Sequence, residues 1–412
     1  MKTAFAIVLV LSLNATTSAQ TSAPLFELPA PTGTLPVGTT QWFVTDPSRE
    51  ETFAPGKRRD VEVIAWYPAS PASPASLAPY MRDGMEEVLS FARVAKLGDA
   101  YNGLVGVKTH AVLDAPPSKT PNRFPVIVFS HGYTGLPSSH TALFEDLASH
   151  GWAVLHVVHP YEATGARLAD GTVVTYTDEN NAFRPGVAAV FNEWGPEGPT
   201  VEKVAASTDE AEKETLLRGY LGTLKNTSAV VTRWVLDVKY VLDHLPKSGG
   251  GSALASRLDL SRLGVAGHSM GGVMAGQFCV EDRRCKAGLN YDGIPQYGTM
   301  IDRTMPAPFL MVYSGRAGRA GASDLIYRRA ASKYYRVDVA GTLHLDFSDM
   351  NFWGGPIAKR AFGPIGAERA AELTRLIARE YFGQELLGRK SLLLSGDAQP
   401  IAGLTVRELR KP

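Results

Sequence analysis

Runs of apolar residues alternate with stretches of helical periodicity through the middle of the chain. Residues 125–130 (PVIVFS) and 152–158 (WAVLHVV) are apolar almost throughout, as is typical of strands buried on both faces of a parallel sheet. Between them, residues 139–150 carry apolar positions at helical spacing and precede Gly151, a residue type that often follows a helix end. The pattern predicts a strand–helix–strand unit.

The same alternation continues on both sides of this unit. Short β-branched and aromatic runs at residues 39–45 and 60–67 predict early strands, separated from the rest by a Pro- and Ser-rich loop at 68–76. Helical spacing over 231–245 ends at Pro246, and strands are expected at 262–267, 286–291, 308–313 and 335–340. We therefore predict an α/β fold with a doubly wound, mostly parallel sheet.

One long segment, residues 164–227, interrupts this rhythm. It contains Gly and Pro clusters and one helical piece at 208–224, and it is too long for an ordinary connection. We expect an insertion that acts as a lid over the carboxyl edge of the sheet, with a peripheral decoration as the alternative. The expected organisation is a Pro- and Ala-rich leader at 20–35 and a single domain at 36–412.

Composition and charge narrow the range of partners. The chain has 412 residues, of which 44% are hydrophobic, and its 42 Lys and Arg nearly balance its 41 Asp and Glu. Since no basic block with interleaved aromatics is present, neither nucleic acid nor an anionic membrane surface is an expected partner. A neutral or amphipathic small molecule or lipid suits this surface better.

The N-terminus has the three parts of a secretory signal peptide. Met1-Lys2 is followed by an apolar run at 4–13 and by the small residues Thr17-Ser18-Ala19. The run is about half of the roughly 20 residues that span a bilayer, so we expect cleavage near Ala19 and no integral membrane segment in the mature chain. The predicted location is secreted or periplasmic.

Two cysteines, Cys279 and Cys285, lie close together in the sequence. In an exported protein they are expected to form a disulfide, with two unpaired buried thiols as the alternative. A metal site is disfavoured because no His lies near them in sequence and two ligands do not complete a zinc cage. We expect no metal and no organic cofactor.

The segment Gly267-His268-Ser269-Met270-Gly271-Gly272 suggests nucleophilic chemistry. An apolar strand precedes it and small residues at helical spacing follow it, which is the arrangement of a nucleophile elbow, although a structural glycine turn is the alternative. A serine nucleophile needs a base, and in this fold the order along the chain is serine, acid, histidine. Only one of the nine histidines, His344, follows Ser269, so it is the candidate base.

Two acids remain candidates between the serine and the histidine. Asp292 ends the predicted strand 286–291, and Asp324 follows strand 308–313 after a Gly-rich loop. The commoner arrangement places the acid after the later strand and favours Asp324. Its long glycine-rich approach is a poor support for a residue that must orient an imidazole, which favours Asp292.

Backbone N–H groups are expected to stabilise an oxyanion. One belongs to Met270, directly after the nucleophile, and the other to Tyr133 in the SHGYTG loop that follows strand 125–130. Phe352 and Trp353, shortly after His344, are candidates for the wall of an acyl pocket, with core packing as the alternative.

Several stretches in one order resemble a known family. FPVIVFSHGYTG, DLASHGWAVLHVVHP, GHSMGG, RCKAGLNYDG and HLDFSD, with PVG at Pro36 and WYPA at Trp66, resemble the platelet-activating-factor acetylhydrolase family of α/β-hydrolases over about residues 35–382. The resemblance implies an α/β-hydrolase fold and calcium-independent hydrolysis of short or oxidised acyl esters. It implies Ser269, Asp292 and His344 as the triad, and Tyr133 and Met270 as the oxyanion donors.

The chain also departs from that family. Asp292 is followed by Gly293-Ile294-Pro295 where mammalian members have an aromatic residue, and the insertion at 164–227 has no assigned counterpart. GYT together with SMGG is also similar to bacterial cutinase-type polyester hydrolases, a reading that predicts Asp324 as the acid. Two further alternatives are an α/β-hydrolase peptidase and a binding module on an inactive scaffold.

Overall fold

The computed structural model describes residues 24–70, 75–249, 251–294, 299–395 and 400–411. The predicted signal peptide at 1–19 lies outside these residues, as does the start of the predicted leader. Residues 24–36 form neither helix nor strand, and the Leu35 N–H donates to the Ser149 carbonyl at 3.1 Å.

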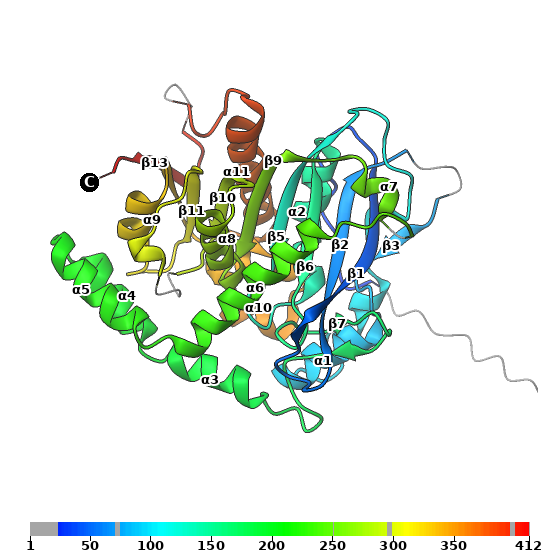
Figure 1. Ribbon diagram of the computed structural model, residues 1–412, viewed down its shortest axis with the longest axis horizontal. Coiled ribbons are helices and arrows are strands. Elements are labelled where there is room, and N and C mark those ends of the chain that lie inside the picture. Colours follow the sequence, from blue (N-terminus) through cyan, green and yellow to red (C-terminus); the bar gives the residue numbers. More distant parts are fainter. Residues whose placement is uncertain (1–23, 71–74, 250, 295–298, 396–399, 412) are drawn as a thin grey trace, which may run out of the picture.

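Eleven strands of the described chain form one sheet (Figure 1): β1 (Val37–Glu50), β2 (Arg58–Pro68), β3 (Leu77–Pro79), β4 (Lys108–Leu113), β5 (Phe124–Ser130), β6 (Ala153–Val158), β9 (Leu258–His268), β10 (Cys285–Tyr291), β11 (Phe309–Ser314), β12 (Tyr334–Val339) and β13 (Leu404–Leu409). Their order across the sheet is β13-β12-β11-β10-β9-β5-β6-β2-β1-β4-β3. The six strands from β12 to β6 are parallel, whereas β13 and β2 pair antiparallel with the ends of this set. This is the predicted α/β-hydrolase fold with a mostly parallel sheet.

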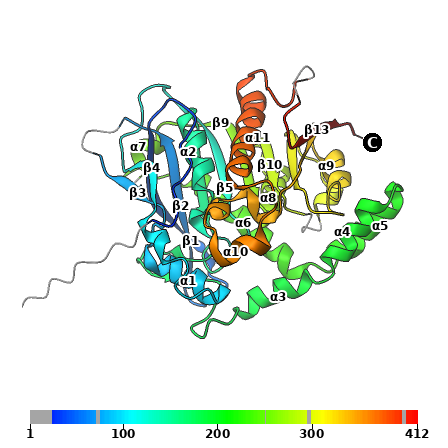
Figure 2. The same ribbon diagram turned by 180° about the vertical axis from the view of Figure 1, so that it is seen from behind.

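Helices cover both faces of the sheet (Figures 1 and 2). On one face lie α6 (Lys225–Asp243) and α8 (Met270–Glu281), and on the other lie α2 (Thr141–Ser149) and α11 (Ala367–Leu387). Alternate residues of β5 enter two different cores, with Val126 and Val128 on the α6 side and Ile127 and Phe129 on the α2 side. A strand buried on both faces is therefore apolar throughout, which is why the sequence pattern identifies it.

Seven further α-helices lie in the described residues. They are α1 (Met85–Ala95), α3 (Pro185–Glu193), α4 (Glu197–Ala206), α5 (Glu210–Leu221), α7 (Ser252–Ala255), α9 (Asp324–Ala330) and α10 (Gly355–Ala361).

The chain direction across the sheet reverses at β5. The connection from β5 leads to β6 on one side, and the chain then returns to β9 on the other side of β5. Ligands of open α/β sheets bind at the carboxyl ends of the strands near such a reversal. The carboxyl ends of β5, β9 and β10 are neighbours there and lead into the predicted oxyanion loop, nucleophile and acid.

The segment at 164–227 forms a small hairpin, β7 (Ala166–Arg167) with β8 (Val173–Val174), followed by α3, α4 and α5. In Figure 1 these three helices form an arc at the lower left. Val201 of α4 packs with Ile294 and Ala322, which follow β10 and β11. The insertion thus contacts loops at the carboxyl edge of the sheet.

Ion pairs join the insertion to the same edge. Arg218 of α5 pairs with Asp302 at 2.6 Å, and Arg328 of α9 pairs with Glu210 at 2.8 Å. These groups are partly or largely exposed, so solvent screens both pairs and each contributes little to stability. The contacts hold the insertion in place weakly compared with the apolar cores.

The predicted disulfide is present between Cys279 and Cys285 and joins the end of α8 to the start of β10. In the part of the chain that the structure describes, no helix is both long and apolar enough to cross a lipid bilayer.

Candidate active site

Ser269 lies on a sharp turn between β9 and α8. Its backbone has φ 54° and ψ −122°, a conformation that L residues adopt rarely and that is typical of a strained functional turn. The turn packs tightly against the neighbouring strand, because a Cβ atom on Gly271 would lie 2.0 Å from the Ser130 carbonyl oxygen. A glycine at position 271 is thus required by the close approach of α8 to β5.

Asp292 directly follows β10 and is held by three hydrogen bonds. Its carboxylate accepts from the Ser314 N–H at 2.8 Å, from the Ser314 hydroxyl at 2.9 Å, and contacts His344 Nδ1 at 2.8 Å. Burial alone would raise the pKa of Asp292, but the hydrogen bond and charge of His344, with the Ser314 N–H, outweigh it and lower that pKa. The ionised carboxylate is therefore the favoured form.

The turn that carries Asp292 is shaped by its neighbours. Asn290 accepts from the Gly293 N–H at 2.7 Å and donates to the Gly293 carbonyl at 2.8 Å. A Cβ atom on Gly293 would lie 2.1 Å from the Ser269 carbonyl oxygen. The Asp292 turn and the Ser269 turn are therefore in direct backbone contact.

His344 begins a short 3₁₀ segment, His344–Phe347, after β12. Its side chain is 29% exposed, whereas that of Asp292 is 2% exposed. Its ring packs on the His268 ring, with centroids 4.5 Å apart, and its carbonyl lies 2.9 Å from His268 Nε2. With Nδ1 bound to a carboxylate and the backbone held by His268, the His344 imidazole has a defined orientation.

The structure brings the predicted nucleophile turn, Asp292 and His344 together and engages Asp324 elsewhere. Asp324 accepts from the Tyr334 hydroxyl at 2.7 Å and from Arg336 at 2.9 Å. It lies at the first position of α9, and its partners belong to β12. These contacts are those of a structural carboxylate.

The loop after β5 lies against Ser269, as the prediction of an oxyanion site requires. A Cβ atom on Gly132 would be 3.2 Å from the Ser269 Cβ, so the Gly132–Tyr133 backbone borders the serine side chain. Met270 is the first residue of α8, and a helix leaves its first N–H groups without intrahelical acceptors. Both predicted N–H groups thus lie next to Ser269 in the chain or in space.

The side chain of Tyr133 connects this loop to the insertion. Its ring packs against Phe191 and Trp194, each with centroids 5.7 Å apart, and also contacts Trp234 of α6. Phe191 belongs to α3 and Trp194 follows it. The insertion therefore forms part of the aromatic surroundings of the oxyanion loop.

Trp353 belongs to a third apolar cluster, whereas Phe352 is half-buried. Trp353 is buried against Phe91 of α1 and against Tyr101, and Phe352 stacks on Phe26 at 6.0 Å. The core-packing alternative accounts for these contacts.

Sequence reasoning missed Ser314 and underrated His268. Ser314 supports Asp292 because β10 and β11 are parallel neighbours, a pairing and register that no local sequence pattern indicates. His268 lies in the predicted nucleophile segment without a predicted role, yet its Nε2 binds the backbone carbonyl of His344. Their one sequence signal is position: each is the last residue of its strand.

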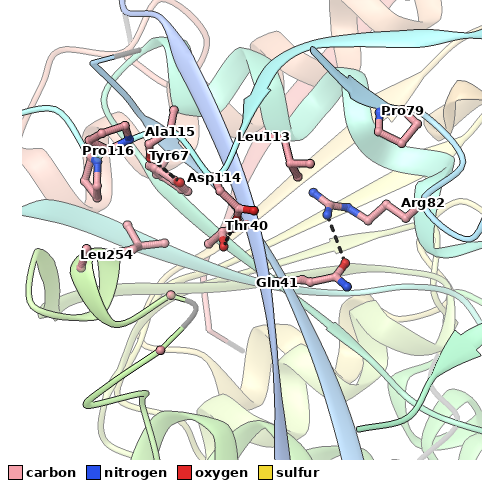
Figure 3. Close-up of a pocket in the computed structure, with 14 residues that line it drawn as sticks. Thr40, Gln41, Tyr67, Pro79, Arg82, Leu113, Asp114, Ala115, Pro116 and Leu254 are labelled. Carbon is pink, nitrogen blue, oxygen red and sulfur yellow. Dashed lines mark hydrogen bonds between the residues drawn. The ribbon is translucent and has the colours of Figure 1, made fainter. Parts of the chain in front are cut away.

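A cavity of about 650 Å³ lies away from these groups (Figure 3). It borders the end of β2 and the start of β1, where the Thr40 hydroxyl donates to Asp114 and Arg82 donates to Gln41. Trp66 pairs with Val154 near the start of β6, which places this cavity at the amino edge of the parallel strands. Ser269, Asp292 and His344 follow carboxyl ends, so the cavity is not their substrate site.

Potential metal ligands do not gather in the described part of the chain: no group of three or more His, Cys, Asp or Glu residues there is arranged to hold an ion. The site described above consists of a serine, an imidazole, a carboxylate and backbone donors. Such a set suits proton transfer and nucleophilic attack.

Comparisons with known proteins agree with the fold. The chain is similar to platelet-activating factor acetylhydrolases of Cavia porcellus (28% identical over 270 residues) and Canis lupus familiaris (24% over 283 residues). These alignments cover 62% and 66% of this chain but only 56% and 60% of the relatives. A solved ferulic acid esterase from Streptomyces cinnamoneus is 28% identical with a TM-score of 0.69, over 92% of this chain and 99% of that one.

A family assignment rests on a longer match. The sequence model described as platelet-activating factor acetylhydrolase, isoform II, matches residues 21–383, which is most of the chain and includes every predicted site residue. The chain therefore belongs to the platelet-activating factor acetylhydrolase isoform II family, a family of carboxylic ester hydrolases with the α/β-hydrolase fold.

Proposed function

We propose that this chain is a serine carboxylic-ester hydrolase that acts on short-chain acyl esters or phospholipid-like esters. The observation that carries the proposal is the 2.8 Å contact between His344 Nδ1 and the buried Asp292 carboxylate, beside the strained turn of Ser269. Family membership and the similarity to a solved esterase support the same chemistry.

In the proposed reaction, the Ser269 hydroxyl attacks the ester carbonyl while His344 Nε2 takes its proton. The ionised Asp292 keeps the proton of His344 on Nδ1, leaves Nε2 free to accept, and stabilises the imidazolium that forms. The N–H groups of Tyr133 and Met270 stabilise the negative charge that develops on the carbonyl oxygen.

Collapse of the tetrahedral intermediate releases the alcohol, which takes its proton from His344. The acyl group remains as an ester of Ser269. A water then attacks this ester, His344 accepts its proton, and the acid product leaves with Ser269 restored. No redox partner or metal ion enters this sequence of steps.

The substrate class is proposed from the relatives and from the site. The similarity to acetylhydrolases favours a short acyl group. The structural similarity to a ferulic acid esterase favours trials of aromatic acyl esters as well. One specific observation supports aromatic acyl esters as substrates: the rings of Phe191 and Trp194 pack around Tyr133. The polyester alternative with Asp324 as the acid has no such support, because Asp324 binds Tyr334 and Arg336.

We also propose that the protein is exported, on the strength of the signal-peptide pattern near Ala19. Expression of the full chain in a bacterial host, followed by mass measurement of the protein from the periplasm and medium, tests this directly. A product that retains Met1 and stays in the cytoplasm would contradict it.

The function itself is tested with a fluorophosphonate probe and an ester panel. We expect the probe to label Ser269 and to fail with Ser269→Ala, and we expect the wild type to hydrolyse p-nitrophenyl acetate much faster than the anilide of the same acyl group. The panel runs from acetyl to long acyl chains and includes methyl ferulate, a phospholipid and a polyester film. Cleavage of the anilide without ester turnover would favour the peptidase alternative, and no labelling of Ser269 would favour an inactive scaffold.

A further inference from the structure

A second set of serine, histidine and aspartate lies behind the oxyanion loop. His159 Nε2 lies 3.0 Å from the hydroxyl of Ser130, the last residue of β5, and His159 Nδ1 lies 2.8 Å from Asp237 of α6. All three side chains have 0% exposure, and the His159 ring stacks on Trp234 with centroids 4.0 Å apart. No substrate can reach this set, so its role must be exerted through the groups that it holds.

The positive charges around Asp237 keep its carboxyl group ionised. Arg59 donates to Asp237 at 2.7 Å and Arg49 donates at 2.9 Å. Burial by itself would raise the pKa of Asp237, but the charge of Arg59 and the hydrogen bonds from His159 and Arg59 lower it strongly. Asp237 is therefore a carboxylate that only accepts, and His159 Nδ1 carries the proton that it accepts.

The remaining hydrogen bonds of His159 follow from this tautomer. Burial lowers the pKa of His159 despite its contact with Asp237, so the ring is neutral and Nε2 has no proton. Nε2 then accepts from the Ser130 hydroxyl, while the backbone N–H of His159 donates to His131 Nε2 at 3.1 Å. Each polar atom of His159 has one assigned role.

His131 links this hydrogen-bonded set to the oxyanion loop. Burial, with the nearby His159, lowers the pKa of His131 to about 3, so this ring is neutral as well. Because its Nε2 accepts from His159, its proton is on Nδ1, which donates to the Gly132 carbonyl at 2.7 Å. The same carbonyl accepts from the Gly135 N–H at 2.8 Å.

The Gly132 carbonyl and the Tyr133 N–H belong to one peptide group. A trans peptide is planar with these two groups pointing in opposite directions, so fixing the carbonyl fixes the direction of the N–H. Two donors on the carbonyl also polarise the amide and strengthen its N–H as a donor. The carbonyl is held on the His131 side, which leaves the Tyr133 N–H on the other side of the peptide.

We propose that His131, supported by the buried Ser130–His159–Asp237 set, is a positioning residue that aims and polarises the Tyr133 N–H for the oxyanion. This inference rests on the proposed ester hydrolysis, because it assigns that N–H a role in the transition state. It assigns a role to a residue outside the proposed triad and outside the proposed oxyanion donors.

Two substitutions of His131 separate this role from general stability. In His131→Asn the side-chain amide can occupy the place of Nδ1 and donate to the Gly132 carbonyl. In His131→Gln the amide reaches the place of Nε2 instead, so the contact with the His159 N–H is kept and the donor to Gly132 is lost. Both are amides in the same buried position and serve as each other's control.

The assay compares p-nitrophenyl acetate with its thionoester, in which sulfur replaces the carbonyl oxygen and accepts hydrogen bonds poorly. We expect His131→Gln to lower kcat on the oxygen ester about 10- to 100-fold with little change in KM, since one full oxyanion donor is worth roughly 100- to 1,000-fold. The preference for the oxygen ester over the thionoester should fall by about tenfold or more. His131→Asn should stay within about threefold of the wild type in both quantities.

The outcomes separate this inference from the proposed function. If the wild type and its Ser269→Ala variant hydrolyse the ester equally, the proposed function fails. If the wild type is active but His131→Gln keeps the wild-type preference for oxygen over sulfur, or His131→Asn loses as much as His131→Gln, the role of His131 is overturned. A loss of rate without a change in this preference also overturns it.

One measurement needs no variant to fold. In wild-type protein labelled with ¹⁵N-histidine, NMR reports which ring nitrogen of each neutral histidine carries the proton. We expect His131 to be protonated at Nδ1 throughout the range from pH 5 to pH 8. Protonation at Nε2 would remove the donor to Gly132 and contradict the proposal.

Discussion

Replacing Asp292 by Asn tests the assignment of the catalytic acid most directly. In the wild type the carboxylate oxygen that faces His344 accepts the Nδ1 proton at 2.8 Å, while the other oxygen accepts the Ser314 N–H. Asn keeps one acceptor for Ser314 but turns an NH₂ group toward His344. Two donors then face each other, which favours the His344 tautomer with its proton on Nε2.

That tautomer cannot accept the proton of Ser269. In the serine-protease template the equivalent change lowers kcat about 10⁴-fold. We expect a loss of about 10³- to 10⁴-fold here, which corresponds to about 4–5.5 kcal/mol of activation free energy. The change keeps size and shape, so the thermal unfolding midpoint should move by only a few degrees.

Asp324→Asn is the matched control. It removes the charge opposite Arg336 at 2.9 Å and weakens the contact with the Tyr334 hydroxyl. We expect stability to fall by about 1–2 kcal/mol while kcat for p-nitrophenyl acetate stays within about twofold. The reverse result, with Asp324→Asn inactive and Asp292→Asn active, would refute the assignment and favour the polyester-hydrolase arrangement.

Three further changes test other parts of the structure. Gly271→Ala places a Cβ 2.0 Å from the Ser130 carbonyl oxygen, so we expect lost activity and a large loss of stability in thermal unfolding; a fully active, stable variant would contradict this packing. Burial, together with nearby Asp83 and Glu62, raises the pKa of Glu87 to about 8, so the folded state keeps a proton that the unfolded state loses above its pKa of 4.5. The stability that depends on this proton is present below pH 4.5 and is lost as the pH rises toward 8. The free energy of unfolding of Glu87→Gln, measured by denaturant titration, should therefore rise by at least about 2 kcal/mol relative to the wild type between these two pH values. Parallel curves of stability against pH for the two proteins would contradict this. Asp302→Asn breaks an exposed pair with Arg218 and should leave the thermal unfolding midpoint almost unchanged, whereas a clear drop would mean that the insertion is held chiefly by its ion pairs.

The sequence predicted secondary structure best for strands that helices cover on both faces, because such strands must be apolar along their length. Strands β5 and β6, most of β10 and the second half of β9 are buried on both faces, so their apolar character is visible in the local sequence. The observed bounds differ from the expected ones by a few residues. At the N-terminal side, β1 extends to Val37–Glu50 because it pairs along most of its length with β2, a partner that local pattern does not show.

The insertion was less predictable. Only the helix α5 was anticipated, as residues 208–224, and its start is explained by Asp209, whose side chain accepts from the Ala211 and Glu212 N–H groups. Helices α3 and α4 bury few residues, so their apolar stripes are short and the pattern is weak. Their partners, such as Ile294 and Ala322 for Val201, come from distant parts of the chain.

The same limit applies to the candidate site. Chain order singled out His344, because one histidine follows Ser269, but the choice between Asp292 and Asp324 depends on which strand end faces the imidazole. Ser314 supports Asp292 only through the register of β10 and β11. Pairing across a sheet is a tertiary property, and a single sequence contains no direct record of it.

The two Ser–His–Asp sets show why residue types alone do not define a catalytic site. Ser130 ends a strand and is fully buried, and its hydroxyl donates to a histidine that stacks on Trp234. Ser269 has a positive φ at the start of a helix and is partly exposed, with a histidine that is 29% exposed. Nucleophilic attack needs access for substrate and water, whereas orientation of a loop needs their exclusion, so from burial we expect reaction at Ser269 and support from Ser130. The buried Ser130–His159–Asp237 set lies behind the loop that carries the Tyr133 N–H, which the exposed Ser269 site would use. A fully hydrogen-bonded core and a strained, accessible turn would thus stabilise the same transition state.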